Sequence, residues 1–126
     1  MTRINVVPVQ ELTVRHLCAE YRELPRVFGL AYNASMSKRP WTDKQPKTYT
    51  LGTGHVLFFY DKLMFLSDRH QQIVKEMLSR GYKPTMQNHL ACRWAEHIPS
   101  AYWKNYMPTE DALRVNRERI AERLLK

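Results

Sequence analysis

Apolar residues at helical spacing dominate the first part of the chain, and this pattern constrains the fold more than any other feature of the sequence. Four of them share one face of an α-helix: Leu17, Tyr21, Leu24 and Phe28. Their offsets of i, i+4, i+7 and i+11 are those of a helix that buries one side. Pro25 interrupts the pattern, because proline has no backbone N–H to donate. The sequence therefore predicts one long helix from Leu12 to about Met36, kinked at Pro25.

A second stretch, from Phe58 to about Arg80, also has helical periodicity, and Gly81 follows it as a C-terminal stop. Its inward positions are predicted to be Phe59, Leu63, Leu66, Ile73, Met77 and Leu78. Its polar face is predicted to carry Asp61, Lys62, Arg69 and Glu76.

A third helix is predicted to begin at Pro108 and to run to the end of the chain. Proline tolerates the first turn, and the acidic residues Glu110 and Asp111 suit the positive end of the helix dipole. The inward positions of this helix are predicted to be Leu113, Ile120 and Leu124. The cations expected on its outer side are Arg114, Arg117, Arg119, Arg123 and Lys126.

The connections between these helices lack periodicity. Residues 38–54 combine prolines, glycines and lysines in a basic loop, and residues 82–107 are expected to be irregular, with one short helix around Ala91 to His97. No segment shows the alternation of a strand. We therefore predict an all-α fold, with residues 1–126 forming one compact domain of three principal helices joined by long irregular connections.

The charge balance points to a polyanionic partner. The chain has 20 Lys and Arg against 12 Asp and Glu, a formal net charge of +8 over 126 residues. Nucleic acid, an anionic membrane surface and an acidic protein all fit that charge. The sequence has no apolar run long enough to span a membrane and no signal-peptide core, so we expect a cytoplasmic protein. Cys18 and Cys92 are expected to be free thiols, and no metal site is expected.

A polar stripe on the first predicted helix is the most informative surface feature. It consists of Arg15, His16, Ala19, Arg22, Glu23 and Arg26. These residues form either a solvated face with ordinary ion pairs, each worth about 0.2–0.5 kcal/mol, or a surface that binds DNA. Three arginines around a single carboxylate repel one another, and DNA phosphates would relieve that repulsion.

The N-terminus offers a candidate nucleophile. Met1 precedes Thr2, a small residue after which the initiator methionine is commonly removed. The α-amine of Thr2 would then be free. An α-amine has a reference pKa of about 7.7–8.0, so part of it is unprotonated near pH 7. By itself this terminus is typical of an inert chain end, because very many proteins begin with Met-Thr.

Several runs of sequence closely resemble the pyrimidine-dimer DNA glycosylase and abasic-site (AP) lyase family, the type of the T-even bacteriophage endonuclease V. They are Thr2-Arg3-Ile4-Asn5, His16-Leu17, residues 19–29, Leu51-Gly52, Gly54-His55-Val56, residues 58–63 and Arg80-Gly81. The likeness continues at Tyr106, Pro108, Glu110, Arg119 and Glu122. It covers nearly the whole chain and is weakest between residues 82 and 105.

The resemblance implies a mechanism and roles for individual residues. The amine of Thr2 would attack deoxyribose C1′ of a UV-induced cyclobutane dimer, expel the base as an imine forms, and nick the strand by β-elimination. Glu23 would be the essential acid. Arg3, Arg22 and Arg26 would bind phosphates, and His16 would shape the site. With Arg15, Arg117, Arg119 and Arg123 these form the predicted DNA-binding set. No metal or organic cofactor is implied, and the expected partner is damaged double-stranded DNA.

Three departures from the family bear on specificity. Arg15 and Arg123 stand where the family's best-known member has glutamine and lysine. That member also continues, beyond the position of Lys126, into an aromatic-rich tail that contacts damaged DNA. We therefore expect less discrimination in favour of dimers over abasic sites. The residues that offer aromatic contact instead are Trp41, Tyr49, Tyr102 and Trp103, each of which fits a packing role in the core or a loop equally well. His55 is expected either to line the DNA-binding surface of the protein or to be a hydrogen-bonded structural residue.

Other functions fit parts of the sequence. The same chemistry on another damaged base or on abasic sites is the nearest alternative. A non-catalytic DNA-bending protein would keep the arginines without needing Thr2 or Glu23. A helix-turn-helix regulator would need two short helices joined by a tight turn, and no such pair is found. We expect a monomer. The sequence does not determine the preferred lesion, the source organism or whether Met1 is removed.

Overall fold

The computed structural model describes residues 3–37 and 40–125, and within these ranges it is all-α, as predicted. The α-helices are α1 (Val14–Glu23), α2 (Pro25–Met36), α3 (Leu63–Ser79), α4 (Leu90–Trp94) and α5 (Glu110–Leu124). Short 3-10 turns η1 to η4 lie at Val9–Glu11, Trp41–Lys44, Leu57–Phe59 and Ser100–Tyr102. Extended pairing in the described part of the chain is limited to a single bridge between Lys62 and Trp103.

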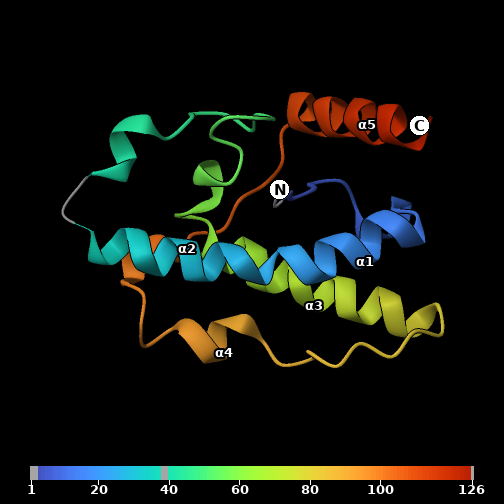
Figure 1. Ribbon diagram of the computed structural model, residues 1–126, viewed down its shortest axis with the longest axis horizontal. Coiled ribbons are helices and arrows are strands. Elements are labelled where there is room, and N and C mark those ends of the chain that lie inside the picture. The colour runs from blue at the N-terminus through green and yellow to red at the C-terminus, as the bar shows by residue number, and fades with distance from the viewer. Residues whose placement is uncertain (1–2, 38–39, 126) are drawn as a thin grey trace.

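The long first helix of the prediction is two helices with one residue between them. Leu24 keeps helical angles (φ −56°, ψ −43°) and its N–H still reaches the carbonyl of Glu20 at 2.8 Å. Pro25 is then the first residue of α2, a position where its missing N–H costs no helical hydrogen bond. The two helices consequently follow one another almost in line (Figure 1).

Helix α3 ends at Ser79, shortly before the left-handed Gly81 (φ +92°) that the sequence indicates as its stop, but it begins at Leu63 rather than at Phe58. The reason is a tertiary contact. The N–H of Lys104 donates to the carbonyl of Asp61 at 3.2 Å, and the N–H of Phe65 points to the carbonyl of Lys104 at 3.4 Å. A distant segment therefore holds residues 61–65 while the helix starts. Asp61 and Lys62 precede α3 and do not lie on its polar face.

The last helix begins close to the predicted position. The hydroxyl of Thr109 caps it by accepting from the N–H of Ala112 at 3.0 Å. Its inner face differs from the prediction, because Asn116 is fully buried whereas Leu124 is 48% exposed. Leu78 of α3, also predicted to point inward, is exposed. In the region expected to be irregular, the predicted short helix is α4.

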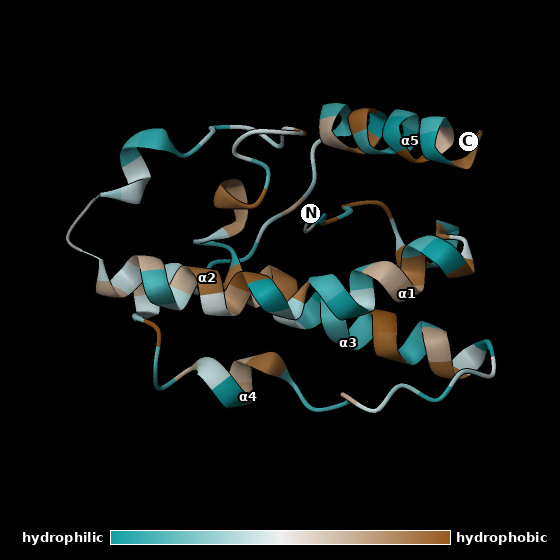
Figure 2. Cartoon of the chain, viewed as in Figure 1, coloured by the Kyte–Doolittle hydropathy of each residue, from teal (hydrophilic) through white to brown (hydrophobic). Residues whose placement is uncertain are grey.

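The N-terminal segment, residues 3–8, lies between α5 and the α1–α3 layer (Figure 1). Helix α3 packs against α1, α4 and η1. The core runs from Ile4 and Val7 of that segment through Leu17, Phe28 and Phe59 into the other elements. Figure 2 shows hydrophobic and hydrophilic residues mixed along every helix, with α5 largely hydrophilic. None of the helices in the described ranges is both long and apolar enough to cross a membrane.

Candidate active site and nucleic-acid interface

Buried side chains hold the backbone of the N-terminal segment. The side-chain oxygen of Asn116 accepts from the N–H groups of Val6 (2.7 Å) and Val7 (3.1 Å). The side-chain amide of Asn116 donates to the side chain of Asn5 at 2.9 Å. Asn5 in turn donates to Glu20 of α1 at 2.9 Å. The segment is thus fixed to α5 on one side and to α1 on the other.

Glu20 and Arg69 extend this network into the core. Arg69 donates to both carboxylate oxygens of Glu20 and to the carbonyl of Val7 at 2.7 Å. Both side chains are almost fully buried. The prediction that Arg69 lies on the polar face of its helix is therefore wrong. The charge of Arg69 is neutralised inside the protein by Glu20, and both oxygens of the Glu20 carboxylate are bound by Arg69.

Next to the segment, α1 and α5 border a hollow of about 320 Å³. Its lining residues are Arg3, Asn5, Arg15, His16, Ala19, Glu20, Glu23 and Arg123. Five of these lining residues are site residues predicted from the sequence: Arg3, Arg15, His16, Glu23 and Arg123. The α1 part of the polar stripe that lines the hollow, Arg15, His16, Ala19 and Glu23, thus shares it with residues of the N-terminal segment and of α5.

The carboxylate of Glu23 lies beside the start of the described chain. Its Oε2 accepts from the backbone N–H of Arg3 at 3.3 Å. Among the described residues Glu23 forms no ion pair, in contrast to Glu20. Of the two carboxylates of α1 that line the hollow, only that of Glu23 is left without a cation bound to it in the described structure.

Arginine side chains surround this carboxylate with an excess of positive charge. Burial, together with the charges of Arg119 and Arg123, lowers the pKa of Arg3 from its usual value. Arg3 Nη1 and Arg119 Nε are shielded from solvent and have no hydrogen-bond partner among the described residues. Buried donors of this kind are costly unless a ligand satisfies them. The arrangement suits an anion with several acceptor oxygens, such as a phosphate.

His16 contributes a neutral group to the hollow. Burial lowers its pKa, and the charges of Arg15, Arg3 and Arg123 lower it further. Its Nδ1 lies 3.1 Å from the hydroxyl of Thr13 at the start of α1. The ring is therefore mainly neutral near pH 7, and a neutral imidazole can donate a hydrogen bond to a ligand or accept one from it.

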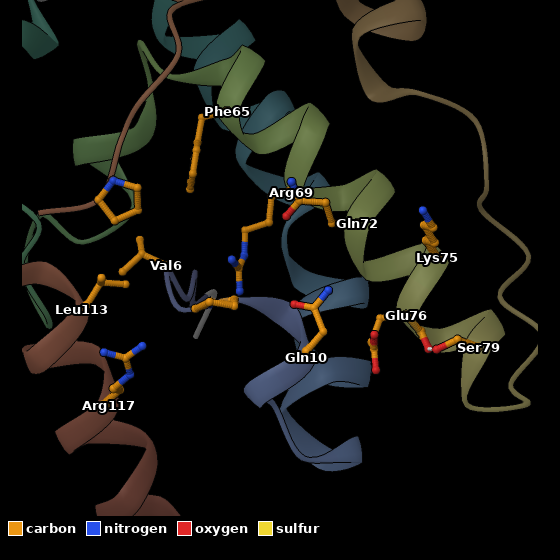
Figure 3. Close-up of a pocket in the computed structure, with 12 residues that line it drawn as sticks. Val6, Gln10, Phe65, Arg69, Gln72, Lys75, Glu76, Ser79, Leu113 and Arg117 are labelled. Carbon is orange, nitrogen blue, oxygen red and sulfur yellow. Dashed lines mark hydrogen bonds between the residues drawn. The ribbon is translucent and has the colours of Figure 1, made fainter. Parts of the chain in front are cut away.

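The remaining predicted DNA-binding arginines occupy other places. Arg22 and Arg26 are exposed on α1 and α2, outside the hollow but on the same helical stripe. Arg119 is half-buried and close enough to Arg3 to influence its pKa. Arg117 is bound by two hydrogen bonds to Glu11, at 3.0 and 2.8 Å. It lines a separate cavity of about 700 Å³ between η1, α3 and α5, where Figure 3 shows its side chain near Val6 and Leu113.

The aromatic candidates are mainly packing residues. Tyr49 is buried, and its hydroxyl donates to the carbonyl of Ile4 at 2.9 Å. The indole N–H of Trp103 donates to the carbonyl of Ile98 at 3.1 Å, and that of Trp41 to the hydroxyl of Tyr102 at 2.9 Å. Trp41, Tyr102 and Trp103 remain partly exposed. The structural alternative is thus the right one for Tyr49.

Sequence reasoning missed the buried polar residues Glu20, Arg69 and Asn116, although a signal for them was present. Glu20 lies three residues after Leu17 and four before Leu24, which places it on the apolar face of α1. Arg69 stands in the same relation to Leu66 and Ile73. Charged residues at such positions in two helices are candidates for a buried pair.

The catalytic role predicted for Thr2 concerns a residue outside the described ranges. Met1, Thr2 and Lys126 lie outside the described residues. Cys18 and Cys92 are free thiols, as expected. In the described ranges no group of three or more His, Cys, Asp or Glu side chains is arranged to hold a metal ion.

Comparison with known families places this geometry in context. A family model described as pyrimidine dimer DNA glycosylase matches residues 1–90. That range contains every residue that lines the hollow except Arg123, and it also contains Arg69, the buried partner of Glu20.

Proposed function

Since this chain belongs to the pyrimidine dimer DNA glycosylase family and is thereby a DNA-repair glycosylase, we propose that it excises cyclobutane pyrimidine dimers with the α-amine of Thr2 as the nucleophile. The observation that carries the proposal is the contact between Glu23 and the backbone of Arg3 (3.3 Å). Three covalent bonds separate the Arg3 nitrogen from the amine of Thr2. Among the described residues that line the hollow, Glu23 is thus the carboxylate outside a buried ion pair, and it contacts the backbone nitrogen that follows Thr2.

The proposed reaction has two stages. In the first, the free amine attacks C1′ of the damaged nucleotide, the glycosidic bond breaks, and the base leaves with a proton. Opening of the sugar ring then yields an imine between the Thr2 nitrogen and C1′. In the second, a proton leaves C2′ and the C3′–O bond breaks, which cuts the strand on the 3′ side. Water releases the sugar from the amine.

Glu23 has two tasks in this scheme. Its negative charge stabilises the positive charge that develops on the sugar as the base departs. It also accepts and returns protons during ring opening and elimination. A carboxylate already neutralised by a buried guanidinium would do neither, and this favours Glu23 over Glu20.

The arginines supply the binding surface. Arg3, Arg119 and Arg123 approach one another closely enough to shift the pKa of Arg3, and Arg15 lines the same hollow. We assign this group, with the exposed Arg22 and Arg26, to the phosphates of damaged duplex DNA. Neutral His16 is assigned to the wall of the site.

Strand cleavage on two substrates tests the proposal. The purified protein is incubated with UV-irradiated supercoiled plasmid and with a duplex oligonucleotide that contains one abasic site, and untreated plasmid is the control. Nicking of the irradiated plasmid and of the abasic duplex, with the control intact, is expected. Cleavage of the abasic duplex alone would redirect the chemistry to abasic sites. Binding without cleavage of either would make the protein a DNA-bending module.

A further inference from the structure

Ile4 is held by hydrogen bonds at both of its backbone groups. Its N–H donates to Nε2 of His55 at 2.8 Å, and its carbonyl accepts from the hydroxyl of Tyr49 at 2.9 Å. Ile4 is completely buried, and His55 and Tyr49 are 4% and 7% exposed. The partners come from the loop before α3, more than 40 residues further along the chain.

The hydrogen bonds of His55 fix its protonation state. Because Nε2 accepts from Ile4, the ring proton is on Nδ1, which donates to the carbonyl of Thr50 at 2.8 Å. Burial lowers the pKa of His55, in agreement with a neutral ring. The tight turn before the ring depends on Gly54 (φ +87°), where a Cβ would lie 2.7 Å from Cγ of Pro46.

We propose that His55 is a positioning residue for the N-terminal amine: its neutral Nε2 fixes Ile4 so that the chain end is directed at Glu23. This inference rests on the proposed function, in which that amine is the nucleophile. Once Met1 is removed, only Thr2 and Arg3 precede Ile4, and the Arg3 N–H already contacts Glu23. Two hydrogen bonds, from Ile4 to His55 and from Arg3 to Glu23, thus hold successive backbone nitrogens of the described chain.

Apart from the Arg3 contact with Glu23, the other bonds of the segment do not replace this one, because they all lie on the C-terminal side of the Ile4 nitrogen. Tyr49 holds the Ile4 carbonyl, and Asn5 binds Glu20. Asn116 and Arg69 hold the backbone of Val6 and Val7. Loss of the His55 bond would leave the fold anchored and allow the end to move. A displacement of about 1 Å at a reacting group can cost about 10²-fold in rate.

Two neutral substitutions separate positioning from packing. In His55→Gln the side-chain oxygen reaches the former place of Nε2 and accepts from Ile4, but nothing donates to Thr50. In His55→Asn the side-chain amide reaches the place of Nδ1 and donates to Thr50, but nothing accepts from Ile4. Both variants lose the ring and its charge change, and they differ from each other by one methylene group.

The measurement is the single-turnover rate of borohydride-trapped adduct on abasic duplex DNA at saturating protein, alongside the Kd for the same DNA. His55→Asn should be slower by about 10-fold or more, with Kd unchanged. His55→Gln should recover most of the rate. Hydrogen exchange at the Ile4 amide should be fast in the Asn variant and slow in the Gln variant.

Mapping the adduct in the unsubstituted protein separates the two hypotheses. An adduct at Thr2, with equal rates in the Asn and Gln variants or with wild-type rates in both, would refute the positioning role and leave the proposed function standing. A rate loss that only mirrors loss of DNA affinity or of folded protein would make His55 structural. An adduct at a different residue would refute the proposed function, and the positioning role with it.

Discussion

Arg69 and Glu20 form a buried ion pair in which the guanidinium contacts both carboxylate oxygens, one of them at 3.1 Å through Nη2. Arg69 also binds the Val7 carbonyl, so the pair fastens the N-terminal segment to α1 and α3. Three residues after Glu20, Glu23 points into the hollow and meets the start of the segment instead. Neighbouring carboxylates on one helix thus take different roles because only one of them is paired in the core.

Substitution of the two glutamates by glutamine should therefore affect different properties: the reaction rate for Glu23 and the stability of the fold for Glu20. Glu23→Gln should keep the fold and the DNA affinity but retain less than about a tenth of the glycosylase rate. This corresponds to an activation barrier raised by more than roughly 1.4 kcal/mol. Glu20→Gln should lower the free energy of unfolding by about 3–5 kcal/mol, because it leaves the buried charge of Arg69 unpaired. Single-turnover kinetics and denaturant unfolding measure the two effects. A stable Glu20→Gln protein with a collapsed rate would reverse the assignment.

Arg119 and Arg117 provide a matched pair on α5. Arg119→Ala should reduce the slope of log Kd against log salt concentration by about one unit, the effect of one lost phosphate contact. The sequence alone predicts the same for Arg117, but its guanidinium is bound by Glu11 on the side of the other cavity. Arg117→Ala should leave the slope unchanged. Titration of fluorescent duplex DNA at several salt concentrations measures both, and equal slopes for the two variants would contradict the assignment of the binding face.

Arg15 should strengthen binding to DNA of any sequence rather than the chemical step, because it is an exposed cation at the edge of the hollow. Arg15→Gln should weaken binding to unirradiated DNA. When unirradiated DNA is present as a competitor, the variant should show a higher ratio of cleavage at dimers to cleavage at abasic sites. Competition with unirradiated duplex measures the effect. The control is Arg114→Gln, an exposed arginine paired with Asp111 and Glu118. A loss of abasic-site turnover in Arg15→Gln at saturating protein would assign Arg15 to the reaction instead.

His70 should make the protein less stable in mild acid. It is fully buried on α3, stacked on Tyr21 at 5.6 Å, and burial lowers its pKa to about 4 from 6.5. The unfolded chain therefore binds more protons between these values, and the stabilisation is complete above about pH 6.5 and lost as the pH falls toward 4. The slope should reach about 1.4 kcal/mol per pH unit.

His70→Phe should remove this contribution, since the phenyl ring keeps the stacking and does not titrate. Denaturant unfolding from about pH 4.5 to about pH 7, an interval that covers most of the predicted loss of stability, compares the variant with the unsubstituted protein and with the exposed control His97→Gln. An equally steep loss of stability in His70→Phe would assign the acid sensitivity to other groups.

Helical periodicity predicts the all-α fold and both ends of the first helical stretch closely, because those signals are local. The polar stripe of the first predicted helix likewise identifies Arg15, His16 and Glu23, which line the hollow on α1. Partners far apart in the sequence are not predictable in this way. Glu20 and Arg69 are separated by 49 positions, and the start of α3 is set by contact with Lys104. Both depend on how the chain returns to itself.

The most direct test of the central claim is borohydride trapping on abasic duplex DNA followed by mapping of the adduct. Reduction converts an imine into a stable secondary amine, so the nucleophile stays attached to the sugar. Two preparations are compared, one beginning at Thr2 and one that retains Met1. We expect an adduct at Thr2 in the first and a greatly reduced yield in the second, whose Thr2 nitrogen is an amide. An adduct on a lysine, or equal yields from the two preparations, would contradict the assignment of the Thr2 amine as the nucleophile.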